Sequence, residues 1–390
     1  MQFKDIIGQR VLINHLTEII DSGRIGHAQL FHGANGYGTL PLAIAYAQYL
    51  NCSNRQHYES GDLRADSCGE CPSCKKYQAL AHPDLHLFFP TATNDRVKKE
   101  PTSAQFVADF VEYLASCRQY ATLEGWMASR GAEDKKGYIS VPDANEFIRQ
   151  TSLKAYEASH KVFIIWMAEM MRADAGGAAQ KMLKVLEEPS DNTVIILVAE
   201  NISYMPLTIL SRTQSVHVGP IEGDALLRAM EPQIAASGDE GKARALVADA
   251  QGDYLRATAN LERSERTQQF AGLFVDWMRQ LFKLNIKTLS AWVDQVSAMG
   301  REQQRRFLMY AQESIRACYL SNAAGYSIVS ELDFGDEKFN KAFPTMITQR
   351  NVEAIDKVFS DTIYAIDRNA YHKIAFMSLS FSISSLLRKR

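Results

Sequence analysis

The 390-residue sequence has neither a large excess of one charge nor a long hydrophobic run. Its 43 Lys and Arg residues against 45 Asp and Glu residues give a formal net charge of −2, which excludes a uniformly basic protein that coats nucleic acid. No run approaches the roughly 18 apolar residues of a membrane span. The N-terminus also lacks the apolar stretch of a signal peptide, so we expect a cytoplasmic protein with no membrane partner.

Proline and glycine are scarce as well, with 11 and 22 residues respectively. These counts exclude a collagen-like chain and a Pro/Gly-rich disordered one. What remains, 46% hydrophobic and 23% charged residues, is ordinary for a folded globular protein. At roughly 100 to 200 residues per domain, the length suffices for two to four domains.

Short apolar runs alternate with helical patterns over residues 1–220. Continuous apolar runs predict buried strands, and apolar residues at helical spacing predict helices. The strands are expected at 28–31, 162–166 and 194–199, and the helices at 11–20, 40–50 and 178–186. This alternation predicts an α/β domain with a parallel sheet and flanking helices.

Residues 90–137 interrupt that pattern with a polar, charge-rich stretch that contains one amphipathic segment. We interpret it as an insertion with a helix of its own, and as a surface elaboration without dedicated chemistry. After residue 220 the strand signals disappear. Residues 221–263 predict a small helical domain, and residues 264–390 carry two long apolar stripes at helical spacing that predict an all-α packing domain.

Four of the six cysteines, Cys52, Cys68, Cys71 and Cys74, fall close together in the sequence. In a reducing compartment such a cluster favours metal binding over disulfides. Four thiolates satisfy the tetrahedral preference of Zn²⁺ and close the site to water, so we predict a structural zinc module at residues 52–74. A redox or Fe–S site and a set of unrelated free thiols are the alternatives.

A glycine-rich loop, containing Gly33, Gly36 and Gly38, follows the first predicted strand with the spacing of a P-loop. The two residues that should come next, Lys and Ser or Thr, are replaced by Thr39 and Leu40, so the phosphates and Mg²⁺ lose their usual side-chain ligands. The loop amides could still accept an anion. The alternative is that Gly33 to Gly38 is merely a turn.

A second nucleotide-binding element is also altered. The strand at 162–166 should be followed by an Asp-Glu pair in a P-loop ATPase, but the chain has Trp166 and Met167 there. Neither side chain can hold Mg²⁺ or activate water. Because both the P-loop side chains and the Asp-Glu pair are missing, the sequence predicts a P-loop fold without its hydrolytic chemistry.

Together these features resemble the AAA+ clamp-loader subunits of bacterial DNA polymerase III, most closely the delta prime type. The resemblance covers most of residues 1–220 apart from the insertion. It rests on the four-cysteine module and on the segments Phe3 to Gln9, His27 to Gly33, Leu153 to Glu157, Leu183 to Pro189 and Ile209 to Thr213. It implies an α/β AAA+ P-loop domain at 1–220, a helical lid at 221–263 and a helical collar, or oligomerisation, domain at 264–390.

The resemblance also implies a role for Arg212. In such five-subunit loaders the arginine of a Ser-Arg-Cys motif reaches the ATP bound by the adjoining subunit. Ser211 and Arg212 match this motif, while Thr213 replaces its cysteine. An arginine finger of this kind neutralises charge on the transferred phosphoryl group. On the residues alone, Arg212 would be a surface or salt-bridged arginine.

The function that the sequence predicts is a non-hydrolysing clamp-loader subunit that supplies Arg212 to a neighbouring ATPase and itself holds structural Zn²⁺ but no ATP. The implied partners are the delta and gamma/tau subunits, the beta sliding clamp and primer-template DNA, within the DNA polymerase III holoenzyme. One alternative is an ATP-binding gamma/tau-like ATPase, which the missing Lys and Asp-Glu pair disfavour. The other is a zinc-dependent DNA-binding protein, which the near-zero charge disfavours.

Overall fold

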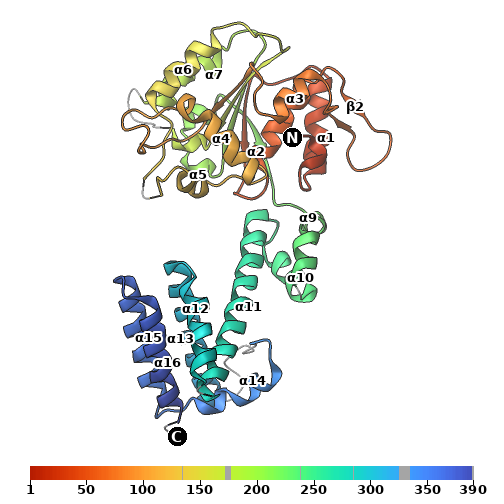
Figure 1. The fold of residues 1–390 in the computed structure, drawn as a ribbon. Coiled ribbons are helices and arrows are strands. Elements are labelled where there is room, and N and C mark those ends of the chain that lie inside the picture. Colours follow the sequence, from red (N-terminus) through yellow and green to blue (C-terminus); the bar gives the residue numbers. More distant parts are fainter. Residues whose placement is uncertain (134, 172–176, 238, 284, 325–333, 389–390) are drawn as a thin grey trace. The chain divides into compact units, whose positions relative to one another are not determined.

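The computed structural model describes residues 1–390 except 134, 172–176, 238, 284, 325–333 and 389–390 (Figure 1). The chain divides into two compact units, Met1–Leu261 and Glu262–Arg390. The boundary between them falls within one long helix, α11 (Tyr254–Lys283). The two units are described in turn.

A five-stranded parallel sheet forms the centre of the first unit, in the order β4-β5-β6-β1-β7 (Figure 1). Three strands, β1 (Ala28–His32), β5 (Lys161–Trp166) and β6 (Thr193–Ala199), match the predicted ones within two residues. The sequence prediction missed β4 (Leu85–Phe88) and β7 (Gln214–His217), which lie at the two edges of the sheet. The predicted parallel sheet is therefore present, with two more strands than expected.

Successive residues of the central strands face two different cores, as the two-residue period of a strand requires. On β5, Val162, Ile164 and Trp166 belong to one core, while Phe163 and Ile165 belong to the other. Helices from different parts of the chain cover each face. The first face carries α1 (Arg10–Asp21), α2 (Thr39–Leu50), α4 (Val107–Ser116) and α5 (Leu123–Ser129), and the second α6 (Val141–Thr151), α7 (Ala178–Glu187) and α8 (Leu207–Leu210).

Helix α2, which follows the glycine loop, is buried along its whole length. A helix that is apolar on all sides has to be enclosed, and α2 is mostly apolar all round. Next along the chain come the two-stranded β2 (Gln56–His57) and β3 (Ala65–Asp66) and the short helix α3 (Pro72–Gln78). These three elements carry or flank the cysteine cluster.

The 90–137 segment is not the surface elaboration that the sequence suggested. Phe106, Phe110 and Trp126 are at most 2% exposed and belong to the core on the first face of the sheet. The rings of Phe89 and Phe110 stack with centroids 3.9 Å apart. The segment looked polar because its apolar residues are spaced around helical turns, and folding gathers them on one side.

Residues 221–261 form a small helical core of their own within the first unit. Helices α9 (Gly223–Ala236) and α10 (Glu240–Asp249) pack with the first part of α11 through Leu226, Met230 and Val247. Tyr120, from the 90–137 segment, joins this core, and its ring lies 4.6 Å from that of Tyr254. These helices therefore touch the domain that carries the glycine loop.

The second unit is all-helical in its described residues. Besides the rest of α11 it comprises α12 (Ile286–Ser297), α13 (Arg301–Ala324), α14 (Glu337–Ala342), α15 (Val352–Asp367) and α16 (His372–Arg388). Both predicted apolar stripes enter its core, in which Trp277 and Trp292 stack with ring centroids 4.8 Å apart. The indole N–H of Trp277 donates to the Ser380 hydroxyl at 2.9 Å.

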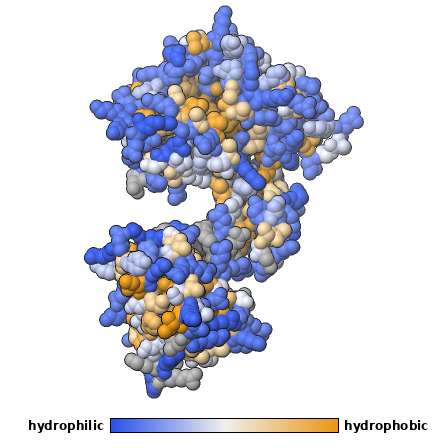
Figure 2. Space-filling view, viewed as in Figure 1, coloured by the Kyte–Doolittle hydropathy of each residue, from blue (hydrophilic) through white to orange (hydrophobic). Residues whose placement is uncertain are grey.

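The visible surface of both units is mostly hydrophilic, with hydrophobic residues scattered among the polar ones (Figure 2). No described helix combines the length and the apolar character needed to cross a membrane. The large exposed hydrophobic side chains of the first unit include Tyr204 and Leu207, which lie shortly before Arg212 in the sequence.

Candidate functional site

The glycine loop lies at the carboxyl edge of the sheet, between β1 and α2, which is where α/β proteins place their ligands. Gly36 and Gly38 have φ angles of +80° and +90°, a conformation that favours glycine. A side chain on Gly33 would lie 2.2 Å from the carbonyl oxygen of Val218. The loop therefore has the glycines that a P-loop path requires, as the sequence predicted.

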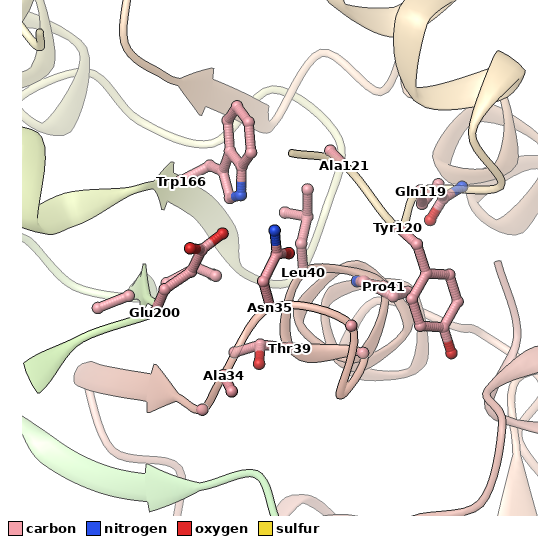
Figure 3. Close-up of a pocket in the computed structure, with 15 residues that line it drawn as sticks. Ala34, Asn35, Thr39, Leu40, Pro41, Gln119, Tyr120, Ala121, Trp166 and Glu200 are labelled. Carbon is pink, nitrogen blue, oxygen red and sulfur yellow. The ribbon is translucent and has the colours of Figure 1, made fainter. Parts of the chain in front are cut away.

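Large side chains line the pocket beside the glycine loop. Trp166 and Leu40 both line the pocket beside the loop (Figure 3). Gln119 and Tyr120, from the segment that seemed a surface insertion, line it as well. The remaining cavity is about 20 Å³, room for about one water molecule, whereas pockets for small organic ligands measure roughly 300 to 1,000 Å³.

Residues at the start of α11 hold the glycine loop from outside. The amide N–H of Tyr254 donates to the Gly36 carbonyl at 3.1 Å. A side chain on Gly36 would lie 1.9 Å from a carboxylate oxygen of Asp253. The amide nitrogen of Leu255 would lie 3.1 Å from a side chain on Gly36. Arg256 forms an ion pair with Asp249 at 3.2 Å. This segment thus presents the Asp253 carboxylate and two backbone amides to the loop.

One acidic residue, Glu200, lines the pocket, and two more, Glu169 and Asp253, lie close to it. Burial, followed by the nearby charges of Glu169 and Asp253, raises the pKa of Glu200 to about 7. Burial also raises the pKa of Glu169 and of Asp253. Of the 15 residues that line the pocket, none is a lysine or an arginine. Among the described residues the pocket therefore has no lysine or arginine in its lining, and an ionised Glu200 would repel a polyphosphate.

Three polar side-chain atoms of the residues that line the pocket, on Thr39, Gln119 and Tyr120, are buried without a hydrogen-bond partner in the described structure. The hydroxyl oxygen of Thr39, at the position where a P-loop has its lysine, is buried and makes no hydrogen bond in the described structure. The same holds for the amide oxygen of Gln119. With a cavity of about 20 Å³ beside them, these atoms have room for a single bridging water and not for a phosphate.

Arg212 lies at the opposite end of the strands from the glycine loop, just before β7 begins. Gln214 of β7 pairs with Gln29 of the parallel strand β1, so Arg212 is level with His27. Gly33 comes six residues after His27, which corresponds to about 20 Å along the strand. Arg212 is therefore far from the glycine loop of its own chain.

The residues around Arg212 fix its backbone and part of its side chain. Ser211 follows the last residue of α8, and its hydroxyl donates to the Thr208 carbonyl at 3.2 Å. Thr213, which replaces the cysteine of the family motif, donates from its hydroxyl to the Ile209 carbonyl at 3.1 Å. The guanidinium of Arg212 pairs with Glu187, at the end of α7. The threonine thus anchors this turn to α8.

The four cysteines of the predicted metal site converge. All four Sγ atoms lie within 4.8 Å of one another. The Sγ of Cys68 is 3.6 Å from that of Cys52 and 3.9 Å from that of Cys74. Four sulfurs placed tetrahedrally at about 2.3 Å from a zinc ion would be about 3.8 Å apart. The cluster could therefore hold a metal ion, and the residues present fit Zn²⁺.

Backbone amides support these sulfurs as thiolates. The amide of Cys71 donates to the Sγ of Cys68 at 3.3 Å, and that of Cys74 donates to the Sγ of Cys71 at 3.4 Å. Such N–H···S bonds are the supporting contacts expected around metal-bound thiolates. The buried carboxylate of Asp66, beside the cluster in sequence, accepts the amides of Phe3 and Lys4 at 2.9 Å each. The cluster is thus tied to the first residues of the chain.

The sequence singled out the glycine loop, the four cysteines and Arg212, and in the structure these lie in three separate places. It missed the residues that close the pocket, Gln119 and Tyr120, because they lie in the segment set aside as an insertion. It also missed Glu200 and Glu187. No local pattern singles out Glu200, whereas Glu187 lies in one of the motifs that carry the family resemblance.

Comparisons with known proteins agree on one family. The family described as DNA polymerase III, delta subunit, matches residues 8–222, more than half of the chain. The subunit delta' of DNA polymerase III from Bacillus subtilis is 28% identical over 211 residues, which cover 54% of this chain and 47% of that protein. The delta' subunit from Haemophilus influenzae is 27% identical over 203 residues, which cover 52% of this chain and 46% of that protein.

The similarity extends to the tau subunits. The DNA polymerase III subunit tau from Escherichia coli is 24% identical over 229 residues, which cover 59% of this chain and 27% of that protein. The chain therefore spans less than half the length of each of these three relatives. The matched part corresponds to the sheet-containing unit, which carries the glycine loop, the cysteine cluster and Arg212.

Proposed function

The chain belongs to the DNA polymerase III delta subunit family, and we propose that it is a non-hydrolysing clamp-loader subunit of the delta prime type. In this role it assembles with ATP-binding gamma/tau subunits and a delta subunit and helps to load the beta sliding clamp onto primer-template DNA. It contributes Arg212 to the ATP site of a neighbouring subunit. The single observation that carries the proposal is the position of Arg212, which is partly exposed at the end of the sheet opposite the narrow glycine-loop pocket.

The narrow pocket supports the non-hydrolysing part of the proposal. A triphosphate would need the space that Trp166 and Leu40 occupy and would face Glu200 without a lysine to neutralise it. Neither Thr39 nor Trp166 can supply the contacts that phosphoryl transfer requires. We therefore expect calorimetry on the purified chain to detect no saturable binding of ATP or ADP. Clear binding would instead favour the gamma/tau-like ATPase.

The helical parts fit the same role. Residues 221–263 would act as the lid, since the start of α11 contacts the glycine loop through Tyr254 and Asp253. Residues 264–390 would act as the collar that contacts other subunits. Zn²⁺ held by Cys52, Cys68, Cys71 and Cys74 would stabilise the 52–74 module, because the binding energy of a structural metal is folding energy.

The arginine-finger assignment is tested in the reconstituted complex. Arg212→Ala should leave assembly intact by size-exclusion chromatography and lower the DNA-stimulated ATPase rate, because one active site loses a contact worth roughly 10³- to 10⁵-fold at that site. Arg244→Ala is the matched control, since Arg244 is also a partly exposed arginine paired with a glutamate, Glu231 at 2.6 Å. An ATPase rate and a clamp-loading rate that Arg212→Ala leaves unchanged would refute the assignment.

A further inference from the structure

We propose that Glu187 is a positioning residue for Arg212: its carboxylate holds the guanidinium so that one edge of it faces outward, toward the nucleotide of a neighbouring subunit. The inference rests on the proposed function and extends it to a second residue. Glu187 is the last residue of α7 and lies 25 positions before Arg212 in the sequence. The contact therefore depends on the fold and not on local sequence.

The hydrogen bonds of Arg212 show which part of its side chain is used within the chain. The Nε atom donates to a carboxylate oxygen of Glu187. The Nη1 atom donates to the Thr208 carbonyl at 2.8 Å and to the Ser211 hydroxyl at 3.1 Å. Since Nε carries one hydrogen and Nη1 two, these bonds use three of the five donors. The two hydrogens of Nη2 have no partner among the described residues.

This division of donors matters because an arginine side chain is long and has many rotamers. A finger that must search these rotamers after docking loses conformational entropy at the moment when it contacts phosphate. Contacts from Glu187 and Thr208, which come from two different helices, restrict the guanidinium before docking. The Nη2 edge is then presented in advance to a phosphate oxygen, for which the planar arginine fork is well suited.

Glu187 is held firmly enough to act as a reference point. The preceding residue, Leu186, is fully buried, and its carbonyl contacts the Nε2 of His27 at 3.0 Å. His27 directly precedes β1, so the end of α7 is tied to the sheet itself. The backbone at the end of α7 is therefore fixed relative to the sheet, and the Glu187 carboxylate reaches Arg212 from that backbone.

The placement of Glu187 also contradicts a local preference. The carboxyl end of a helix carries partial negative charge and favours Lys, Arg or His. Helix α7 instead ends in Glu187, with Glu188 following as its capping residue. Residues that break a local rule are expected at functional positions. The pairing with Arg212 compensates for Glu187, whereas no ion pair is found for Glu188 in the described structure.

The pair is too exposed to matter much for folding. The side chains of Arg212 and Glu187 are 31% and 48% exposed, and ion pairs at such positions add little to stability. Removing the Glu187 carboxylate should therefore leave the melting temperature almost unchanged. A change in the ATPase rate without a change in melting would separate positioning from a general structural role.

The experiment compares Glu187→Ala, Glu187→Gln and the matched control Glu188→Ala in the reconstituted complex. For each complex we measure the DNA-stimulated ATPase rate and subtract the rate of the Arg212→Ala complex. The difference is called the Arg212-dependent rate. Glu187→Ala should lower kcat for this rate about fivefold to tenfold, with KM for ATP nearly unchanged, as expected when one long side chain is released among several rotamers. Glu187→Gln keeps an oxygen acceptor for Nε and should recover most of the rate.

Each outcome bears on a distinct claim. If Arg212→Ala leaves the ATPase rate unchanged, the finger assignment fails and the role of Glu187 fails with it. If Arg212→Ala lowers the rate but Glu187→Ala behaves like Glu188→Ala, the finger stands and the positioning role is refuted. A faster Glu187→Ala complex would also refute it, since Glu187 would then restrain Arg212 instead of presenting it.

Discussion

Replacing Gly36 by alanine tests whether the start of α11 closes the glycine loop. Gly36 has a φ angle of +80°, and a methyl group there would lie 1.9 Å from a carboxylate oxygen of Asp253. Gly61 provides a matched control, because it also has a positive φ, of +99°, but a methyl group on it would meet nothing within 4 Å. Both variants carry the same kind of backbone strain, and only Gly36→Ala adds a collision.

The expected cost follows from the contacts that must change. Alanine at a positive φ costs about 1 to 2 kcal/mol at either position. At Gly36 the Asp253 carboxylate must also move, which breaks its hydrogen bond from the Arg256 amide at 2.9 Å at the start of α11. Losing a helix N-cap costs about 1 kcal/mol. The Leu255 amide nitrogen, 3.1 Å from the same methyl group, adds a smaller repulsion.

Gly36→Ala should therefore lower the free energy of unfolding by about 1 to 2 kcal/mol more than Gly61→Ala does. Since about 1 kcal/mol shifts the melting temperature by roughly 2 to 4 °C in a domain of this size, the two variants should differ by roughly 2 to 8 °C. Scanning calorimetry on the full chain measures this difference. An Asp253→Ala background removes both the collision and the cap, so it should bring the two variants close together. Equal losses in the wild-type background would refute a loop closed by Asp253.

Three further predictions concern the metal, the acidic pocket and its tryptophan. Cys74→Ser, or a strong chelator, should remove zinc found by elemental analysis and lower the melting temperature by several degrees, whereas Cys117→Ser should do neither, because Cys117 lies outside the cluster. Since the pKa of Glu200 is raised to about 7, the folded state binds its proton more tightly, and the free energy of unfolding falls as pH rises from about 4.5 to 7. In urea unfolding, the free energy by which Glu200→Gln is more stable than the wild type should grow from near zero below about pH 4 to as much as about 3 kcal/mol at pH 8. Trp166→Ala should cost about 3 to 5 kcal/mol in urea unfolding, because the indole is 3% exposed, and should still give no ATP binding by calorimetry.

The strands that the sequence predicts are the three central ones of the sheet. In β1, β5 and β6 nearly every residue is buried, and such strands appear in a sequence as continuous apolar runs. The edge strand β7 exposes three of its four residues, so it lacks that signal. Its assignment depends on pairing with β1, which a single sequence does not reveal.

The three predicted sites share one property, which is that short motifs carry them. Glycine spacing, cysteine spacing and the Ser211-Arg212 pair are visible within a few residues. The acidic surroundings of the pocket are not, because Glu169, Glu200 and Asp253 come from three distant segments. Glu169 and Glu200 follow β5 and β6, and parallel strands bring such residues to one edge of a sheet. The electrostatics of the pocket therefore emerge only with the fold.

Under the proposed function, the direction of the strands explains how one chain can lack a nucleotide site and still supply an arginine finger. In a parallel sheet the residues that follow the strands gather at one edge and those that precede them gather at the other. The glycine loop follows β1, and Arg212 precedes β7, so about 20 Å of strand separates them. Trp166 and Leu40, which line the pocket, both lie at the carboxyl ends of the strands. The contacts of Arg212 with Glu187, Thr208 and Ser211 all lie at the amino edge, so under the proposed function the two features can change independently.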